Sequence, residues 1–189
     1  MLSGLVLAGG RSSRMGREKA LLLLPDGRTL LQRQIDLLRA AGAGSVAVSV
    51  GPGKVFPMMN ASPISDAVPD AGPLAGIAAG LRAAPPGLVL VLAVDMPEMS
   101  EKHLRRLVEQ ATAGCGVVPV WEGRCESLVA VYPAALAVSA EAWLAGGQSA
   151  PHAWVRSEEA QGRLKLWEVP AEWAAALRNW NSPGDLPRP

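Results

Sequence analysis

A continuous run of apolar residues near the middle of the chain, 88–94, constrains the fold more than any other segment. Because the run does not alternate with polar residues, it is typical of a central β-strand that is covered on both faces. It follows the breaker Pro85-Pro86-Gly87 and ends at Asp95. Strands of this kind occur mostly in parallel sheets whose crossover connections are helices, so the run predicts an α/β fold.

The rest of the chain alternates short apolar runs with segments of helical spacing, as a mostly parallel sheet requires. Thr29 is placed to cap a helix that ends at Gly42, and Ser100 to cap another. Residues 146–157 have no clear assignment. Further helices are expected to about Ala83 after the loop that starts at Asp66, from Pro133 through Trp143, and from Ser182 onwards. Further strands are expected at 5–7, 45–50, just before Asp66, and at 116–120, 127–131 and 164–169.

Length and composition narrow the class of protein. A chain of 189 residues can bury one substantial core, so one domain spanning 1–189 is expected. The net charge of +1 lacks the basic excess of a nucleic-acid binder. No apolar run reaches the roughly 18 residues of a membrane span, and no signal peptide is recognisable. Cys115 and Cys125 form no C-x-x-C pair, which predicts structural thiols in a reduced, cytoplasmic protein.

Near the N-terminus, the apolar strand 5–7 stops abruptly at Gly9-Gly10. The loop that follows carries four cations, among them Arg14 and Lys19, and no acid before Glu18. The backbone N–H groups of a glycine turn can face an anion, and cations close behind favour a phosphate group. The spacing matches neither the Walker loop nor the dinucleotide fingerprint. The alternative is an ordinary tight turn followed by a solvated basic segment.

Two acidic residues end other expected strands, and ligands of open α/β sheets bind beyond the carboxyl ends of the strands. Asp66 ends one strand and Asp95 ends the apolar run. The partner of Asp95 is either a helix N-terminus or a hard cation such as Mg²⁺, which takes oxygen ligands and bridges substrate phosphates. The phosphate-type loop at a neighbouring strand end favours Mg²⁺. Lys19 and Arg14 are suited to neutralising charge on a phosphoryl group, unless they are simply solvated surface cations.

Two weaker candidates complete the set. Gly72-Pro73-Leu74 opens a helix and is either a contact for a ligand's base or a close-packed turn. Asn179 and Asn181 flank Trp180 and either bind a ligand or cap the short last helix. No histidine is placed to activate a serine of the glycine loop, so a nucleophilic triad is not expected.

Taken together, these segments resemble the MobA-type nucleotidyltransferases, the molybdenum cofactor guanylyltransferase family. The match runs in order along nearly the whole chain. Its segments are L-A-G-G-x-S-x-R-M-G-x-x-K at 7–19, D-x-x-x-x-x-G-P-L-A-G-I at 66–77, D-M-P at 95–97, E-S-L-V-A-V-Y-P at 126–133 and N-W-N-S-P-G-D-L at 179–186. The first is specific for the wider nucleotidyltransferase superfamily, and the later ones indicate the MobA branch.

The resemblance implies a Rossmann-like, three-layer α/β/α fold with a mostly parallel mixed sheet that contains one reversed strand. It implies transfer of GMP from Mg-GTP to the terminal phosphate of molybdopterin, with release of pyrophosphate. Residues 1–100 would form the nucleotide-binding half and 101–189 the acceptor-binding half. GTP and molybdopterin would be the ligands, with molybdenum-insertion proteins and molybdoenzymes as candidate partners.

The resemblance also implies roles for individual residues. Lys19, Arg14 and Asp95 would be catalytic, with Mg²⁺ held by Asp95. Asn179 and Asn181 would lie on the acceptor side. The nucleotide would contact Leu7, Ala8, Gly9, Gly10, Lys19, Ser49, Asp66, Gly72, Pro73, Leu74 and Asp95. Ser49 stands where many family members have an Asn, and 148–152 reads Q-S-A-P-H where a more basic run is expected.

The acceptor phosphate is already a competent nucleophile, so catalysis would rest on in-line positioning and charge neutralisation. Two alternatives stay open. One is a transferase for another base or acceptor, such as a cytidylyltransferase for the same cofactor or for a sugar or alcohol phosphate. The other is a nucleotide-binding module without catalysis that acts as a chaperone or regulator, against which the intact Lys19 and Asp95 argue.

Overall fold

The computed structural model describes residues 1–9, 19–51, 56, 60–66, 68 and 71–180. The strands are β1 (Leu2–Leu7), β2 (Ser45–Val50), β3 (Ser62–Ser65), β4 (Leu88–Ala93), β5 (Gly116–Trp121), β6 (Arg124–Cys125), β7 (Val129–Pro133) and β8 (Leu164–Glu168). The helices are α1 (Leu30–Ala40), α2 (Pro73–Ala83), α3 (Glu101–Gln110), α4 (Ala137–Ala145) and α5 (Pro151–Ala160). Short 3₁₀ turns lie at Lys19–Leu21, Ala134–Leu136 and Ala171–Trp173.

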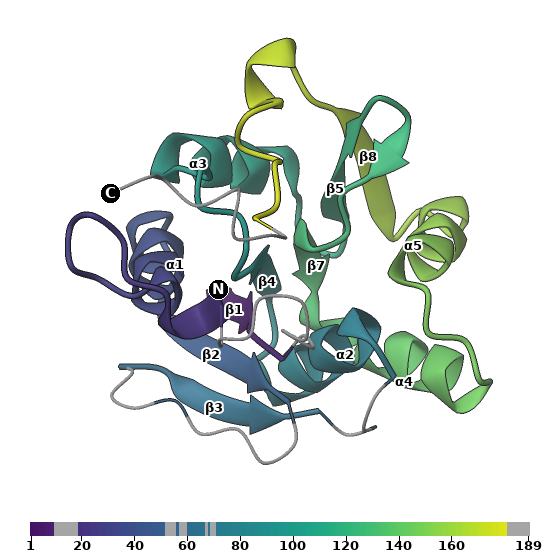
Figure 1. The fold of residues 1–189 in the computed structure, drawn as a ribbon. Helices are drawn as coiled ribbons and strands as arrows, with labels where there is room; N and C mark the ends of the chain where they lie inside the picture. The colour runs from purple at the N-terminus through teal and green to yellow at the C-terminus, as the bar shows by residue number, and fades with distance from the viewer. Residues whose placement is uncertain (10–18, 52–55, 57–59, 67, 69–70, 181–189) are drawn as a thin grey trace.

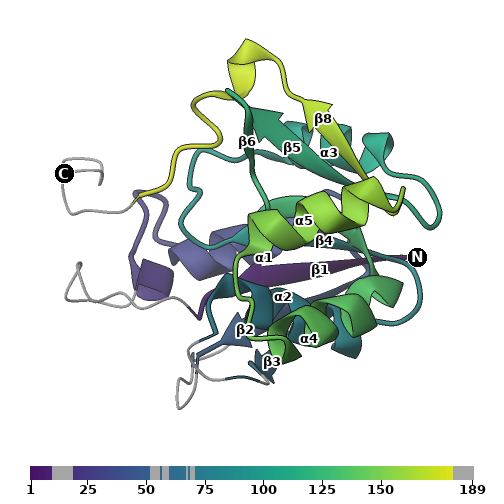
Figure 2. The same cartoon turned by 90° about the vertical axis from the view of Figure 1, so that its right-hand side faces the viewer.

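All the strands in the described residues belong to one eight-stranded sheet with the order β3-β2-β1-β4-β7-β5-β6, in which β8 also pairs with β5. Helices α1 and α3 cover one face of the sheet, and α2, α4 and α5 cover the other (Figures 1 and 2). This arrangement confirms the three-layer α/β/α fold that the sequence predicts.

The direction of the strands confirms a mostly parallel mixed sheet, with one correction. Strands β1 to β4 are parallel to one another, and β7 is antiparallel to both β4 and β5. The expectation of one reversed strand is wrong, because the short β6 is also antiparallel to β5. β6 is the return arm of a tight hairpin in which Glu122 and Gly123 have φ of 48° and 75°. Positive φ at both central residues matches the right-handed twist of such a hairpin.

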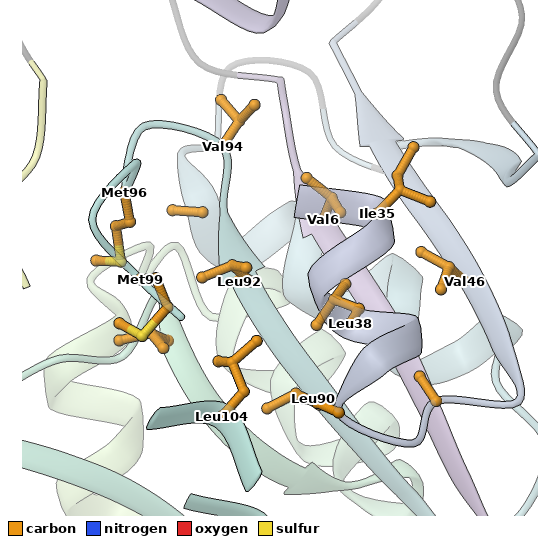
Figure 3. Close-up of a cluster of buried hydrophobic side chains, with 14 of the residues drawn as sticks. Val6, Ile35, Leu38, Val46, Leu90, Leu92, Val94, Met96, Met99 and Leu104 are labelled. Carbon is orange, nitrogen blue, oxygen red and sulfur yellow. The ribbon is translucent and has the colours of Figure 1, made fainter. Parts of the chain in front are cut away.

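In the part of the chain that the structure describes, the core forms two hydrophobic clusters, one on each face of the sheet. Alternate residues of β4 supply both: Leu90 and Leu92 belong to the cluster under α1 and α3, and Val89 and Val91 to the cluster under α2, α4 and α5. Figure 3 shows part of the first cluster. Each fully buried side chain of this size stabilises the fold by about 1.5–3 kcal/mol. The continuous apolar run of β4 is therefore explained by burial of both faces.

The helix boundaries agree with the sequence in part. Thr29 caps α1 as predicted, since its Oγ1 accepts a hydrogen bond of 3.1 Å from the backbone N–H of Gln32. Ser100 is the residue before α3, but its hydroxyl does not cap that helix and lies 2.9 Å from Nδ1 of His103. Pro133 ends β7, and the helix expected to begin there begins at Ala137, after a 3₁₀ turn. None of the described helices is both long enough and apolar enough to cross a membrane.

The unassigned segment 146–157 contains the whole linker between α4 and α5 and the first part of α5. Polar groups as well as apolar ones fix α5. Glu158 is fully buried, and its Oε2 lies 2.6 Å from Nε of Arg163. Ser139 of α4 donates a hydrogen bond to the same carboxylate and accepts one from the indole of Trp154. A buried charged residue interrupts the apolar pattern, which is why the helix is hard to see in the sequence. The helix expected from Ser182 lies outside the described residues.

Candidate active site

The carboxyl ends of β1, β2, β3 and β4 lie at one edge of the sheet because these strands are parallel (Figure 2). Gly9 follows β1, Ser49 is near the end of β2, Asp66 follows β3, and Asp95 follows β4. The structure therefore brings the start of the glycine loop and both predicted carboxylates to the same edge. Gly10 and Arg14, which belong to the same prediction, lie outside the described residues.

The end of β1 is tied to the strands on either side. The backbone N–H of Val94 donates to the carbonyl of Leu7 at 3.1 Å, and that of Ala8 donates to the carbonyl of Ser49 at 3.0 Å. The Leu7 carbonyl and the Ala8 N–H are therefore hydrogen-bonded to the neighbouring strands. The chain leaves the hydrogen-bonding pattern of the sheet only at Gly9. A methyl group on Gly9 would lie 3.4 Å from Oδ2 of Asp66 and 3.1 Å from the backbone N of Gly51. Gly9 is thus a direct neighbour of the Asp66 carboxylate.

Asp66 is held by Ser49 on the neighbouring strand. The buried Ser49 hydroxyl donates to Oδ1 of Asp66 at 2.6 Å. Burial raises the pKa of Asp66 above its usual range, and the hydrogen bond from Ser49 partly offsets this rise. Helix α2 packs closely on Ser49, because a methyl group on Gly76 would lie 2.5 Å from the Ser49 hydroxyl oxygen. Glycine at this position therefore lets α2 approach the edge.

This environment predicts a pH-dependent gain in stability on replacing Asp66 by Asn. A carboxyl whose pKa is higher in the folded chain than in the unfolded chain destabilises the fold as pH rises through that pKa. Asp66→Asn is expected to raise the free energy of unfolding at pH 7 by less than about 1 kcal/mol, because solvent screens a half-exposed group. The asparagine carbonyl can still accept from Ser49. Urea unfolding should show the gain at pH 7 and a smaller one near pH 4, and a loss of stability at pH 7 would contradict the assignment.

The N-terminus of α2 opens onto the same edge. Gly72 precedes the helix with φ of 76°, a left-handed conformation that favours glycine, and Pro73 occupies the first helical position. The first N–H groups of a helix have no partner within it and suit an anion. The side chain of Leu74 is fully buried in the cluster under α2, so Leu74 could contact a ligand only through its backbone.

Lys19 and Asp95 are 76 residues apart in sequence and form an ion pair. The Lys19 ammonium lies 3.3 Å from Oδ2 of Asp95, and the side chains are 16% and 22% exposed. The carbonyl of Asp95 accepts a hydrogen bond of 2.9 Å from the backbone N–H of Trp180. This bond brings the exposed Asn179 next to the turn that carries Asp95. Asn181, the other acceptor-side candidate, lies outside the described residues.

Comparison with known proteins shows to which family this chain belongs. The family model described as the MobA-like NTP transferase domain matches residues 4–162. The chain belongs to this family. The match includes the strand that leads into the glycine loop, the Ser49–Asp66 contact and the turn that carries Asp95. The protein is therefore a nucleotidyltransferase, as the sequence predicts.

Individual relatives agree with the MobA-like assignment. A probable molybdenum cofactor guanylyltransferase of Opitutus terrae is 36% identical over 190 residues, which is 99% of this chain and 94% of that protein. A nucleotidyl transferase of Methanothermobacter thermautotrophicus superposes with a TM-score of 0.77 at 25% identity, covering 98% of this chain and 94% of that one. The molybdopterin-guanine dinucleotide biosynthesis protein A of Archaeoglobus fulgidus superposes with a TM-score of 0.73, at the same identity and coverage.

The oxygen ligands at this edge of the sheet suit Mg²⁺ better than a metal ion whose ligands all come from protein side chains. Within the described residues no group of three or more His, Cys, Asp or Glu side chains could hold a metal ion. Mg²⁺ is commonly bound through one or two carboxylates, with substrate phosphates and water completing its ligands. Asp95 offers a partly exposed carboxylate at the end of β4, 3.3 Å from the Lys19 ammonium. The residues present therefore fit that mode of binding.

Two residues that contact the Asp95 turn were not singled out by the sequence patterns. They are Arg33 and Gln34 of α1, whose side chains bond to the backbone of residues 93–99. A detectable signal was present for Gln34. It occupies the apolar stripe of α1 between Leu31 and Leu38, where a polar side chain needs a buried partner.

Proposed function

We propose that the protein transfers GMP from Mg-GTP to the terminal phosphate of molybdopterin, which releases pyrophosphate and forms the guanine dinucleotide cofactor. The proposal rests mainly on the Lys19–Asp95 ion pair, which lies at the edge of the sheet where the glycine loop begins. The curated relative from Opitutus terrae, similar along 99% of the chain, supports the choice of base and acceptor through its name.

In this reaction an oxygen of the acceptor phosphate attacks the α-phosphorus of GTP. The bond from that phosphorus to the oxygen bridging to the β-phosphate breaks, and pyrophosphate leaves with the electron pair. The attacking phosphate is already anionic, so a general base is not required. The chain's contribution is to hold the two substrates in line and to neutralise the charge that spreads over the phosphate oxygens.

We assign Lys19 to the phosphates of the nucleotide and Asp95 to Mg²⁺. The Lys19 ammonium is partly buried, which strengthens its attraction to a phosphate relative to that of a solvated cation. Mg²⁺ bound there would neutralise charge on the phosphate oxygens. We assign Arg14 to the same cationic group and Gly10 to the nucleotide loop.

We assign the Ser49–Asp66 pair, with Gly9 beside it, to the nucleoside part of GTP. A half-buried carboxylate held by the hydroxyl of a buried serine is a rigid acceptor for ligand N–H or O–H groups. Asn179 is assigned to the acceptor, because the backbone N–H of the next residue, Trp180, donates to the carbonyl of Asp95. We assign Asn181 to the acceptor as well. Molybdenum-insertion proteins and molybdoenzymes are the partners that this product would require.

Pyrophosphate release tests the proposal directly. The full chain is incubated with GTP, CTP, ATP or UTP, each with and without molybdopterin and with and without Mg²⁺. We expect release with GTP only, and only when molybdopterin and Mg²⁺ are both present. Release with CTP and not with GTP would replace the guanylyltransferase by a cytidylyltransferase. Nucleotide binding without release under any condition would instead indicate a module without catalysis.

A further inference from the structure

The turn that carries Asp95 depends on a fully buried glutamine. Gln34 of α1 is 0% exposed, and its Nε2 donates to the carbonyl of Met96 at 2.8 Å. The same nitrogen lies 3.3 Å from the carbonyl of Val94 and 3.4 Å from that of Ala93. These three carbonyls belong to residues on either side of Asp95. The turn that carries Asp95, together with its flanking residues 93–99, is called the Asp95 loop below.

The geometry uses the whole donor capacity of the amide. A glutamine NH₂ has two N–H groups, and three carbonyls surround it. One N–H therefore makes the short bond to Met96, and the other is shared between Val94 and Ala93. β4 ends at Ala93, so the carbonyls beyond it leave the ladder and need other partners in a buried setting. Gln34 satisfies them from outside the sheet and so determines the path of the chain on both sides of Asp95.

The neighbouring Arg33 fixes the far end of the same loop. Its guanidinium donates to the carbonyl of Met99 at 2.8 Å and to Oε1 of Gln34 at 3.3 Å. The side chains of Met96 and Met99 are buried in the cluster shown in Figure 3, which holds the other side of the loop. We call Arg33 and Gln34 the loop clamp.

Helix α1 also fixes the segment that begins with Lys19. The backbone N–H of Leu30, the first residue of α1, donates to the carbonyl of Leu22 at 2.8 Å. The backbone N–H of Leu22 donates in turn to the carbonyl of Lys19 at 3.1 Å. Both partners of the Lys19–Asp95 pair are thus attached to one rigid helix, Lys19 through its first residue and Asp95 through the loop clamp.

From these contacts we infer that Arg33 and Gln34 are positioning residues, which hold the Asp95 carboxylate in register with Lys19 around the metal-bound phosphates. The inference rests on the proposed function, because it takes Asp95 as the residue that holds the metal. A glutamine that only satisfied buried carbonyls would support the fold but would not selectively favour the metal-bound nucleotide.

A measurement that compares two ligands separates these possibilities. The dissociation constants of Mn-GTP and of metal-free GTP are measured on the full chain, the first by water proton relaxation and the second by calorimetry in EDTA. The ratio of the two constants is independent of the fraction of protein that is folded. A positioning residue acts through Asp95 and the metal, so its loss weakens binding of Mn-GTP and leaves that of metal-free GTP unchanged.

Gln34→Met keeps the length of the side chain and removes both N–H donors. We expect it to weaken Mn-GTP binding about tenfold, as changes behind a metal ligand commonly do, with metal-free GTP binding unchanged. Gln32→Met is the matched control, because Gln32 lies on the same helix but donates to Asp36 of that helix at 2.8 Å. The control should leave both dissociation constants as they are in the unmodified chain.

The Asp95→Asn background supplies the decisive comparison. If Gln34 acts through Asp95, adding Gln34→Met to Asp95→Asn should change the dissociation constant of Mn-GTP by less than about twofold. Equal losses for Mn-GTP and metal-free GTP, or a full tenfold loss in the Asp95→Asn background, would overturn the inference and leave Gln34 as a structural residue.

Arg33→Met keeps the inference testable if Gln34→Met fails to fold. Arg33 is only partly buried, and the change removes one bond to the loop and one to Gln34. We expect about a threefold loss in Mn-GTP binding, the equivalent of one hydrogen bond of ordinary strength. No loss in this variant would overturn the loop clamp. An unmodified chain that binds Mn-GTP no more tightly than metal-free GTP would instead contradict the proposed metal role of Asp95, which is a failure of the function and not of the clamp.

Discussion

Replacing Asp95 by Asn is expected to lower kcat about 10²- to 10³-fold while the fold survives. The substitution keeps the size of the side chain and removes the negative charge, so that Mg²⁺ loses its proposed protein ligand. Losses of this size are typical when one preorganised electrostatic contact to a transferring group is removed. The free energy of unfolding should change by about 1 kcal/mol, because the amide oxygen of the asparagine can still accept a hydrogen bond from the Lys19 ammonium.

The measurement is the rate of pyrophosphate release at saturating GTP and acceptor, titrated with Mg²⁺, together with urea unfolding of both proteins. Asp36→Asn is the matched control, since Asp36 is a partly exposed aspartate of α1 that pairs with Arg28. It should retain full turnover. An Asp95→Asn variant with unchanged kcat and unchanged Mg²⁺ dependence would remove Asp95 from the metal site and leave Lys19 without its proposed partner in catalysis.

The fold was predictable because its strongest signals are local. The apolar run of β4 indicates burial on both faces, and Thr29 and Gly42 mark the ends of the region that contains α1. Once the strands are predicted to be parallel, their carboxyl ends must lie at one edge of the sheet. For that reason the approach of Gly9, Asp66 and Asp95 to the same edge follows from the order of elements alone.

The parts that the sequence did not predict depend on contacts between distant residues. Helix α5 is stabilised by the pairing of the buried Glu158 with Arg163, and a buried charge contradicts the pattern of an ordinary amphipathic helix. Gln34 is similar. Its amide meets carbonyls about 60 residues away in the chain, and only the folded chain shows that they need a donor. A polar residue of this kind interrupts the apolar pattern of its helix, but the sequence does not identify the distant group that it contacts.

The second large effect is expected for Lys19→Met. The thioether chain fills nearly the same space but removes the ammonium that we assign to the phosphates of GTP. We expect kcat to fall about 10²- to 10³-fold, again as for loss of one electrostatic contact to the transferring group. The KM for GTP should rise as well, because the ground-state phosphates also carry the charge that Lys19 meets. Lys102→Met, on the exposed side of α3, is the matched control and should leave both constants unchanged.

The double variant decides whether Lys19 and Asp95 act together. Their side chains are in contact at 3.3 Å, and residues in contact commonly show non-additive effects. If both stabilise the same transferring phosphate, removing one misplaces the other, and the combined loss in kcat should fall well short of the product of the single losses. If the loss in kcat of the double variant equals the product of the two single losses, the two residues act on separate steps. In that case the ion pair would be a contact of the unliganded protein that nucleotide binding breaks.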